Sequence, residues 1–310
     1  MMRKPELYIS AGSAEEVRAY IEAGADAVAV GEHRFGMRLP GEIKLDELSE
    51  LIPWVHEQGA KIYVVANKIM ENDLLAELAD YLRRVKELKA DAVVFGDPAV
   101  LIAIRQGAQG LPLHWNAEMT STNYETANYW RAKGATRVVL ARELNLEETL
   151  EIKRQLPNME VEVQVHGITN IYHSKRNLLT NYQEHQGHDQ RRGTGKEEGL
   201  FLIEQERKDE RYPVYEDANG THIMSSDDIC MLEDLHELMG GQIDSFRIDP
   251  LLKPLEYNLT VIQSYRKAID AYFADPEQYA FQEEWMDAIR ELQDPRRELS
   301  FGFFYKEQVY

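Results

Sequence analysis

The stretch GAKIYVVA at residues 59–66 holds the repeating unit of this chain, a Gly-Ala pair followed by a run of β-branched and aromatic residues. The same order occurs in GADAVAVG at residues 24–31 and in GATRVVLA at residues 134–141. Glycine is common directly after a helix, where it adopts a left-handed backbone conformation. Each unit therefore predicts a helix end followed by a strand, and strands that are apolar throughout indicate a parallel sheet covered on both faces.

This alternation of strand and helix continues along most of the chain and gives eight strand–helix units, the number in a closed (β/α)8 barrel. We therefore predict an α/β fold with a TIM-barrel-like core over residues 1–272. The expected strands are Glu6–Ala11, Asp26–Gly31, Lys61–Ala66, Asp91–Gly96, Pro112–Asn116, Thr136–Ala141, Val161–Val165 and Ile243–Ile248. The expected helices include Ala14–Ala23, Leu45–Gln58, Asp73–Lys89, Tyr124–Lys133, Leu146–Gln155, Asp227–Met239 and Glu256–Phe273.

Two segments interrupt this alternation. Residues 168–221 form a polar insertion after strand seven, and the stretch GHDQRRGTGKEEG at residues 187–199 predicts a loop there. Residues 273–310 form an acidic extension with many aromatic residues, which would pack on the barrel or on another subunit. The insertion leaves the carboxyl end of a barrel strand, and barrels carry their functional sites on that face.

The composition narrows the class of protein. The chain has 310 residues, 44% of them hydrophobic, which is enough for one large core. A net charge of −19 disfavours a surface that binds nucleic acid everywhere, because phosphates repel it. One cysteine excludes an internal disulfide and suits a reducing compartment. Since neither a membrane-spanning run nor a signal peptide is evident, we expect a cytoplasmic protein that does not contact a membrane.

Polar side chains follow every expected strand, and in a barrel these strand ends meet at one mouth. Arginines among them favour an anionic ligand, because guanidinium groups pair with carboxylate or phosphate. Alternatively, the arginines pair with acids of the same ring, such as Glu143 or Asp249, or the ring is a solvated rim. We predict Arg142, Glu143 and His166 as catalytic residues, with His166 as a polar or acid–base contact. The predicted substrate-binding residues are Arg38, Asn67, Asp97, Asn116, Glu118 and Arg247.

The insertion has a local excess of basic side chains with tyrosines between them, a combination that suits contact with the RNA backbone and stacking on bases. A solvated loop is the alternative. The expected RNA contacts are Lys175, Arg176, Arg191 and Arg192, and the tyrosines are Tyr172 and Tyr182.

Several catalytic motifs are missing from the sequence. His236-Glu237 lacks the second histidine of a His-Glu-x-x-His zinc site, and neither Gly-x-Ser-x-Gly nor a Walker loop occurs. The spacing of His185 and His188 matches no known zinc pattern, so we expect no metal site. Nothing near Cys230 in the sequence marks it as an activated nucleophile.

The stretch EVQVHGITNIYHSKRNLLTNY at residues 162–182 resembles the signature of the collagenase-like peptidase family U32. In that signature a Glu and a His-Gly precede two cysteines seven residues apart. Glu162 and His166-Gly167 stand in register, whereas Asn170 and Asn177 occupy the two cysteine positions. By the same resemblance, residues 193–195 replace a third cysteine and Cys230 matches the fourth.

The resemblance covers about residues 5–272 and implies a barrel fold. In several members of the family, four cysteines hold a [4Fe–4S] cluster, and these proteins support hydroxylation of ubiquinone precursors or of tRNA and rRNA bases. Clusters are held by thiolates, and a neutral amide is a poor iron ligand. We therefore expect no cluster in this chain and an iron–sulfur cluster only in a paralogous partner.

Short, cysteine-poor members of the family imply a more specific role. This chain would be a subunit for prephenate-dependent hydroxylation of the tRNA wobble uridine to 5-hydroxyuridine. Prephenate would be a co-substrate, and the partners would be tRNA and a cluster-bearing U32 paralogue. Two alternatives stay open: a U32-type peptidase that hydrolyses protein or collagen-like substrates, and a non-catalytic scaffold for the cluster-bearing paralogue.

Overall fold

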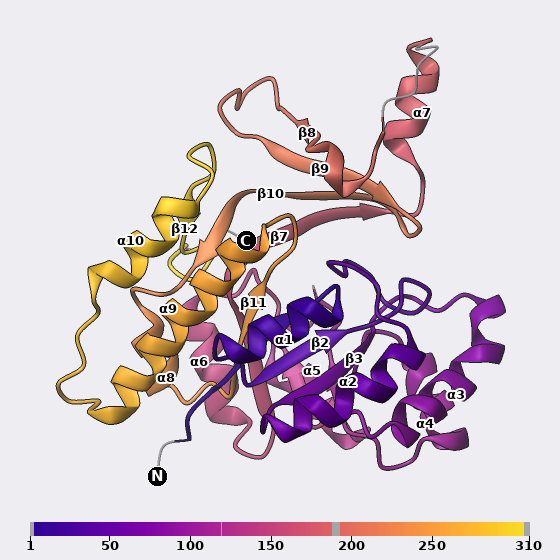
Figure 1. Cartoon of the computed structure of the whole chain (residues 1–310), viewed down its shortest axis with the longest axis horizontal. Coiled ribbons are helices and arrows are strands. Elements are labelled where there is room, and N and C mark those ends of the chain that lie inside the picture. Colours follow the sequence, from indigo (N-terminus) through magenta and orange to yellow (C-terminus); the bar gives the residue numbers. More distant parts are fainter. Residues whose placement is uncertain (1–2, 119, 188–192, 307–310) are drawn as a thin grey trace.

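The computed structural model describes residues 3–118, 120–187 and 193–306. Eight parallel strands form a closed barrel, because each strand pairs with the next and the last pairs with both the first and the seventh. This arrangement confirms the predicted TIM-barrel fold (Figure 1). The barrel strands are β1 (Glu6–Ser10), β2 (Ala27–Val30), β3 (Lys61–Ala66), β4 (Ala92–Phe95), β5 (Leu113–Trp115), β6 (Arg137–Val139), β7 (Glu160–Ser174) and β11 (Ser245–Asp249).

Helices surround the barrel and bury one apolar side each against it. One of them, α4 (Pro98–Gly107), was not among the helices we predicted. Its start has a clear local cause, since the Asp97 side chain caps the helix and Pro98 occupies the first turn. The other barrel helices are α1 (Ala14–Glu22), α2 (Leu45–Glu57), α3 (Asn72–Glu87), α5 (Tyr124–Ala132), α6 (Leu146–Gln155), α8 (Leu235–Gly240) and α9 (Leu255–Ala274).

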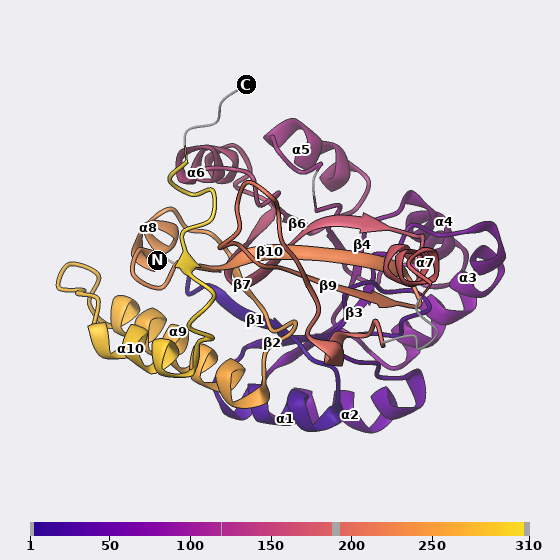
Figure 2. The ribbon, with the colours of Figure 1, turned by 90° about the horizontal axis from the view of Figure 1, so that it is seen from above.

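The insertion is largely an antiparallel extension of the sheet, which its polar composition did not predict, whereas the described part of the predicted loop at residues 187–199 contains no strand. Strand β7 was expected to end at Val165 but continues to Ser174, because β10 (Gly220–Cys230) pairs with it along that length. Strand β10 is followed outward by β9 (Tyr212–Asp217) and β8 (Phe201–Leu202). In Figure 2 these strands cross over the end of the barrel, and α7 (Leu178–His185) stands beyond them.

The helix predicted over Asp227–Met239 is only half correct. Residues up to Cys230 belong to β10, and α8 starts at Leu235. Asp228 explains the difference, because its carboxylate is fully buried and held by Lys253 at 2.5 Å and by Arg297 at 2.6 Å. Residues 228–230 are therefore extended because they pair with β7 and because Asp228 binds two cations that are distant in the sequence.

The C-terminal extension packs on the barrel rather than projecting from it. Helix α10 (Glu283–Leu292) lies against α9, and β12 (Leu299–Ser300) pairs with β10. The backbone N–H of Leu146 donates to the Phe304 carbonyl at 2.9 Å, which fixes the end of the described chain beside α6. In the described ranges, no helix is long and apolar enough to cross a membrane.

A buried arginine fills the end of the barrel opposite the insertion. Arg137 donates to Glu6 at 2.7 Å, to Glu160 at 2.7 Å and to Glu162 at 3.2 Å. Burial raises the pKa of Glu6, but the nearby charges of Arg137 and Lys61 outweigh it and hold the pKa at about 2. The Glu162 of the U32-like signature therefore belongs to an interior ion-pair network.

Candidate functional site

The opposite end of the barrel, under the insertion, encloses a small polar cavity of about 40 Å³. Six of the predicted site residues line it, so the strand ends do bring their side chains together. They are Arg38, Asn67, Asn116, Glu118, Arg142 and Arg247. We call this cavity the mouth.

An ion pair between Arg38 and Glu118 crosses the mouth. Both residues have left-handed backbone conformations, with φ of 55° and 58°. Such conformations are unfavourable for residues other than glycine and are found mostly where a site requires them. The Asn67 Oδ1 accepts from the Met37 backbone N–H at 2.9 Å, and the Asn116 Oδ1 accepts from that of Glu118 at 3.2 Å. The two asparagines thus support the loops that carry the ion pair.

The Glu118 carboxylate lies among the positive charges of the mouth. Burial raises its pKa, but attraction to Arg38, Arg142 and Arg247 outweighs burial and holds the pKa at about 2. The Arg142 Nη2 lies 3.7 Å from Glu118 and donates to the Asn170 carbonyl at 3.0 Å. Asp249 also lines the mouth and interacts with Arg247, as the alternative of pairing within the ring predicted. Because three guanidinium groups face two carboxylates, Glu118 and Asp249, the mouth is suited to an added anion.

Three buried polar atoms in the mouth have no hydrogen-bond partner among the residues the structure describes. They are the Nε of Arg142, the Nε of Arg247 and the Oδ1 of Asn170. A buried polar atom without a partner costs about 1–3 kcal/mol. Since all three residues line the same cavity, these donors and this acceptor are available to a polar ligand.

His166 occupies a different place from the one predicted. It lies within β7, and its ring packs against α9, with Nε2 2.9 Å from the Tyr257 hydroxyl. A bulge causes this, since Arg247 pairs with Gln164 and Ile248 pairs with His166, which turns His166 away from the interior. Burial lowers the pKa of His166 to about 3, so the ring is neutral at pH 7. It does not line the mouth.

Asp97 and Glu143 also lie outside the mouth lining. Asp97 accepts from the Ala99 N–H at 2.8 Å and from the Met70 N–H at 2.9 Å, which makes it a helix cap and a loop anchor. Glu143 is exposed on the loop after β6. Their predicted roles in substrate binding and catalysis stay predictions without support from these positions.

The predicted RNA contacts are only partly described. Lys175 forms an ion pair with Glu71, and Arg176 is exposed at the outer end of β7. Arg191 and Arg192 lie outside the described residues, as does His188. Tyr172 and Tyr182 are both exposed, at 49% and 62%.

Sequence reasoning missed several residues of the mouth lining. Tyr8 points into the barrel from β1, and Met37 precedes Arg38 on its loop. Asn170 and Met224 come from the insertion and pair with each other across β7 and β10. Only Asn170 had a signal in the sequence, its alignment with a cysteine position of the U32 signature.

The cysteine of this chain does not fit a cluster site at the mouth. Cys230 pairs across the sheet with His166, whereas Asn170 is four residues further along β7, roughly 13 Å away at strand spacing. Burial raises the pKa of the Cys230 thiol to about 11, and its sulfur lies 3.9 Å from that of Met286. Within the described ranges, no cluster of three His, Cys, Asp or Glu side chains could hold a metal.

Comparison with known proteins identifies the family to which this chain belongs. The model of peptidase family U32 matches residues 12–309. The tRNA hydroxylation protein P2 of Bacillus subtilis is 47% identical over 312 residues, covering all of both chains. The tRNA hydroxylation protein P1 of the same organism is 30% identical, over 99% of this chain and 74% of its own length.

Among solved structures, a dihydrodipicolinate synthase from Bacillus anthracis covers 94% of this chain and 83% of its own, with a TM-score of 0.50 and 10% identity, a likeness of fold alone. The match of the family model and the full-length relatives agree with the signature at residues 162–182. The chain belongs to peptidase family U32.

Proposed function

We propose that this protein is a component of tRNA hydroxylation that acts on the wobble uridine to give 5-hydroxyuridine. The observation that carries the proposal is its 47% identity, over the whole of both chains, to tRNA hydroxylation protein P2. Similarity of this extent includes the barrel, the insertion and the C-terminal extension. The proposal places the protein with tRNA in the cytoplasm.

Prephenate is the proposed co-substrate, and the mouth is its proposed site. Prephenate carries two carboxylates, and the guanidinium groups of Arg38, Arg142 and Arg247 can form paired hydrogen bonds with them. A cavity of about 40 Å³ holds only a few waters. Entry of the ligand therefore requires Arg38 to leave Glu118, and the strained backbone at both residues would favour such a rearrangement.

The chemistry of oxygen transfer is proposed to reside with a partner. Asn170, Asn177 and the buried Cys230 do not form a set of thiolates, so we propose that this chain holds no cluster. Bacillus subtilis has both a P1 and a P2 protein, and a cluster-bearing U32 paralogue is the proposed partner. This chain would then supply the anion site and contacts to tRNA.

Nucleoside mass spectrometry of tRNA tests this function. Deletion of the gene should remove 5-hydroxyuridine in a strain without another hydroxylation route, and the wild-type gene should restore it. Arg142→Ala should not restore it, because the variant loses a mouth guanidinium. Arg290→Ala is the control, since Arg290 is an exposed arginine on α10, remote from the mouth lining. Unchanged 5-hydroxyuridine in the deletion strain would refute the proposal.

The peptidase alternative stays a prediction. Its direct test is cleavage of casein and gelatin by the purified protein, with Arg142→Ala as the comparison. The scaffold alternative predicts instead that Arg142→Ala restores the modified nucleoside as well as the wild type does. Both outcomes differ from the one expected for the proposed function.

A further inference from the structure

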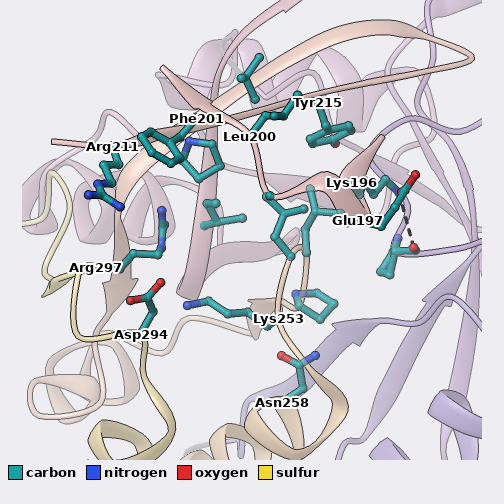
Figure 3. A pocket seen from close by; sticks show the side chains of 18 of the residues that line it. Lys196, Glu197, Leu200, Phe201, Arg211, Tyr215, Lys253, Asn258, Asp294 and Arg297 are labelled. Carbon is teal, nitrogen blue, oxygen red and sulfur yellow. Dashed lines mark hydrogen bonds between the residues drawn. The ribbon is translucent and has the colours of Figure 1, made fainter. Parts of the chain in front are cut away.

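A second and much larger cavity lies outside the barrel, beneath the β8–β9 hairpin (Figure 3). Its volume is about 490 Å³, within the range of sites for small molecules, and it shares no lining residue with the mouth. Three segments form most of its walls: residues 196–201 with 211–215 of the insertion, the loop 250–253 after β11, and residues 294–297 of the C-terminal extension. The rest of the lining comes from Glu16, Tyr20, Pro40, Ile168 and Asn258. We call it the hairpin cavity.

One end of the hairpin cavity is cationic. Figure 3 shows Arg211, Arg297 and Lys253 around this end, together with Asp294, whose carboxylate pairs with Arg296 at 2.9 Å. Lys253 and Arg297 both bind the buried Asp228, which fixes their positions and neutralises part of their charge. Arg211 differs from them, because no carboxylate of the described chain lies within ion-pair distance of its guanidinium. This arginine is therefore available to an anionic group.

Aromatic and other apolar side chains lie beside these cations. The Phe201 ring is 42% exposed, and the Arg211 guanidinium lies over it at 4.7 Å from the ring centre. Leu202 and Ile203, next along the chain, are also exposed. On the inner wall, the Tyr215 ring has the Lys196 ammonium at 5.7 Å from its centre. A ring beside a free guanidinium is the usual combination for stacking a base and holding its phosphate.

The geometry points to a nucleotide of an unpaired RNA strand as the ligand of the hairpin cavity. Its phosphate would pair with Arg211, and its base would stack on Phe201 and enter the cavity. An RNA strand is favoured over a free nucleotide because Ile203, two residues beyond Phe201, offers a further exposed apolar side chain outside the cavity lining, where a neighbouring base can lie. This inference rests on the proposed function, which makes tRNA the substrate, and adds the surface that contacts it.

Binding of a fluorescent 17-nucleotide anticodon hairpin to the purified full chain tests the inference. Phe201→Ala should weaken binding by about 10- to 100-fold, the effect of losing one stacked base. Arg211→Ala should weaken binding and reduce the slope of log K against log salt by about 0.7, the value for one phosphate of a single strand. Arg207→Ala is the matched control, because Arg207 is on the same hairpin and is paired with Glu204 and Glu210.

Weaker binding caused by misfolding of a variant must be distinguished from weaker binding caused by loss of a contact with RNA. Phe201→Leu keeps an apolar side chain on β8 but removes the aromatic ring. This variant should therefore fold normally and yet bind the hairpin as weakly as Phe201→Ala does. Circular dichroism checks the fold of each variant. Uridine monophosphate is the second probe and should bind far more weakly than the hairpin. The expected pattern is loss in the Phe201 and Arg211 variants, with the Arg207 variant equal to the wild type.

Three results would overturn the inference: no binding of the hairpin by the wild type, equal binding by all variants, or binding of uridine monophosphate as tight as that of the hairpin. None of these results depends on 5-hydroxyuridine in cells. The proposed function fails only if the deletion strain keeps the modified nucleoside. The two failures are therefore distinguishable.

Discussion

Replacing Arg137 by methionine should destabilise the barrel by about 3–5 kcal/mol, the usual cost of removing one partner from a buried ion pair. The Arg137 side chain is 2% exposed, and its loss leaves the buried carboxylates of Glu6 and Glu162 with less compensation. The lowered pKa of Glu6 by itself supports a destabilisation of this size. A shift from 4.5 to about 2 corresponds to about 3 kcal/mol, and Lys61 would retain part of it.

The pH dependence gives this prediction a specific sign. Because the folded-state pKa of Glu6 is lowered, its contribution to stability is present above pH 4.5 and is lost as the pH falls towards 2. The difference in stability between the wild type and Arg137→Met should therefore be largest at pH 7 and should shrink in acid. Adding Glu6→Gln to Arg137→Met should recover part of the loss, since a neutral amide is cheaper to bury than an unpaired carboxylate.

Thermal unfolding followed by circular dichroism measures the effect. For a chain of 310 residues, 3–5 kcal/mol corresponds to a fall in Tm of about 5–8 °C. Arg290→Met is the control, because Arg290 is exposed and its surface ion pairs contribute about 0–1 kcal/mol. A Tm of Arg137→Met within about 1 °C of the wild type, or a difference that grows in acid, would refute the reasoning.

Three further predictions concern Arg38 in the mouth, and Cys230 and Asp228 on β10. Arg38→Ala should abolish 5-hydroxyuridine in the complemented deletion strain at unchanged protein level on immunoblots, because it removes a guanidinium from the mouth; normal nucleoside levels would count against an anion site there. Cys230 should react with a thiol reagent only after unfolding, since it is buried and its pKa is raised to about 11; rapid labelling of the native protein would contradict this placement. Asp228→Asn should lower the free energy of unfolding by about 3–5 kcal/mol in urea titrations, because Lys253 and Arg297 lose their shared carboxylate, and a change under 1 kcal/mol would show that the cluster is not needed.

The barrel could be predicted because its signals are local. The Gly-Ala pair before Lys61 and the apolar run to Ala66 specify a helix end and a buried strand without reference to the rest of the chain, and β3 has these bounds. The parallel arrangement then brings Arg38, Arg142 and Arg247 to one mouth, since all strand ends share a face. Local chemistry also explains α4, whose cap Asp97 and first residue Pro98 were visible in the sequence.

The insertion could not be predicted because its signals are not local. Strand β7 continues to Ser174 only because β10 pairs with it from a distance of about fifty residues, and both strands are too polar for apolar periodicity to reveal them. The bulge beside Val165 likewise depends on the register with β11, and it alone decides that His166 faces α9 instead of the mouth. Pairing that the sequence does not show therefore determines that Asn170 lines the mouth and that His166 does not.

The same pairing explains why the two cavities depend on one segment. Strands β7 and β10 leave the barrel together, so the insertion places Asn170 and Met224 over the mouth and also supplies Phe201 and Arg211 to the hairpin cavity. Lys196 joins the two regions, because its ammonium lines the hairpin cavity and donates to the carbonyls of Leu39 and Pro40, directly after Arg38. A rearrangement of the Arg38 loop that opens the mouth must therefore strain or break the contact that holds the wall of the hairpin cavity.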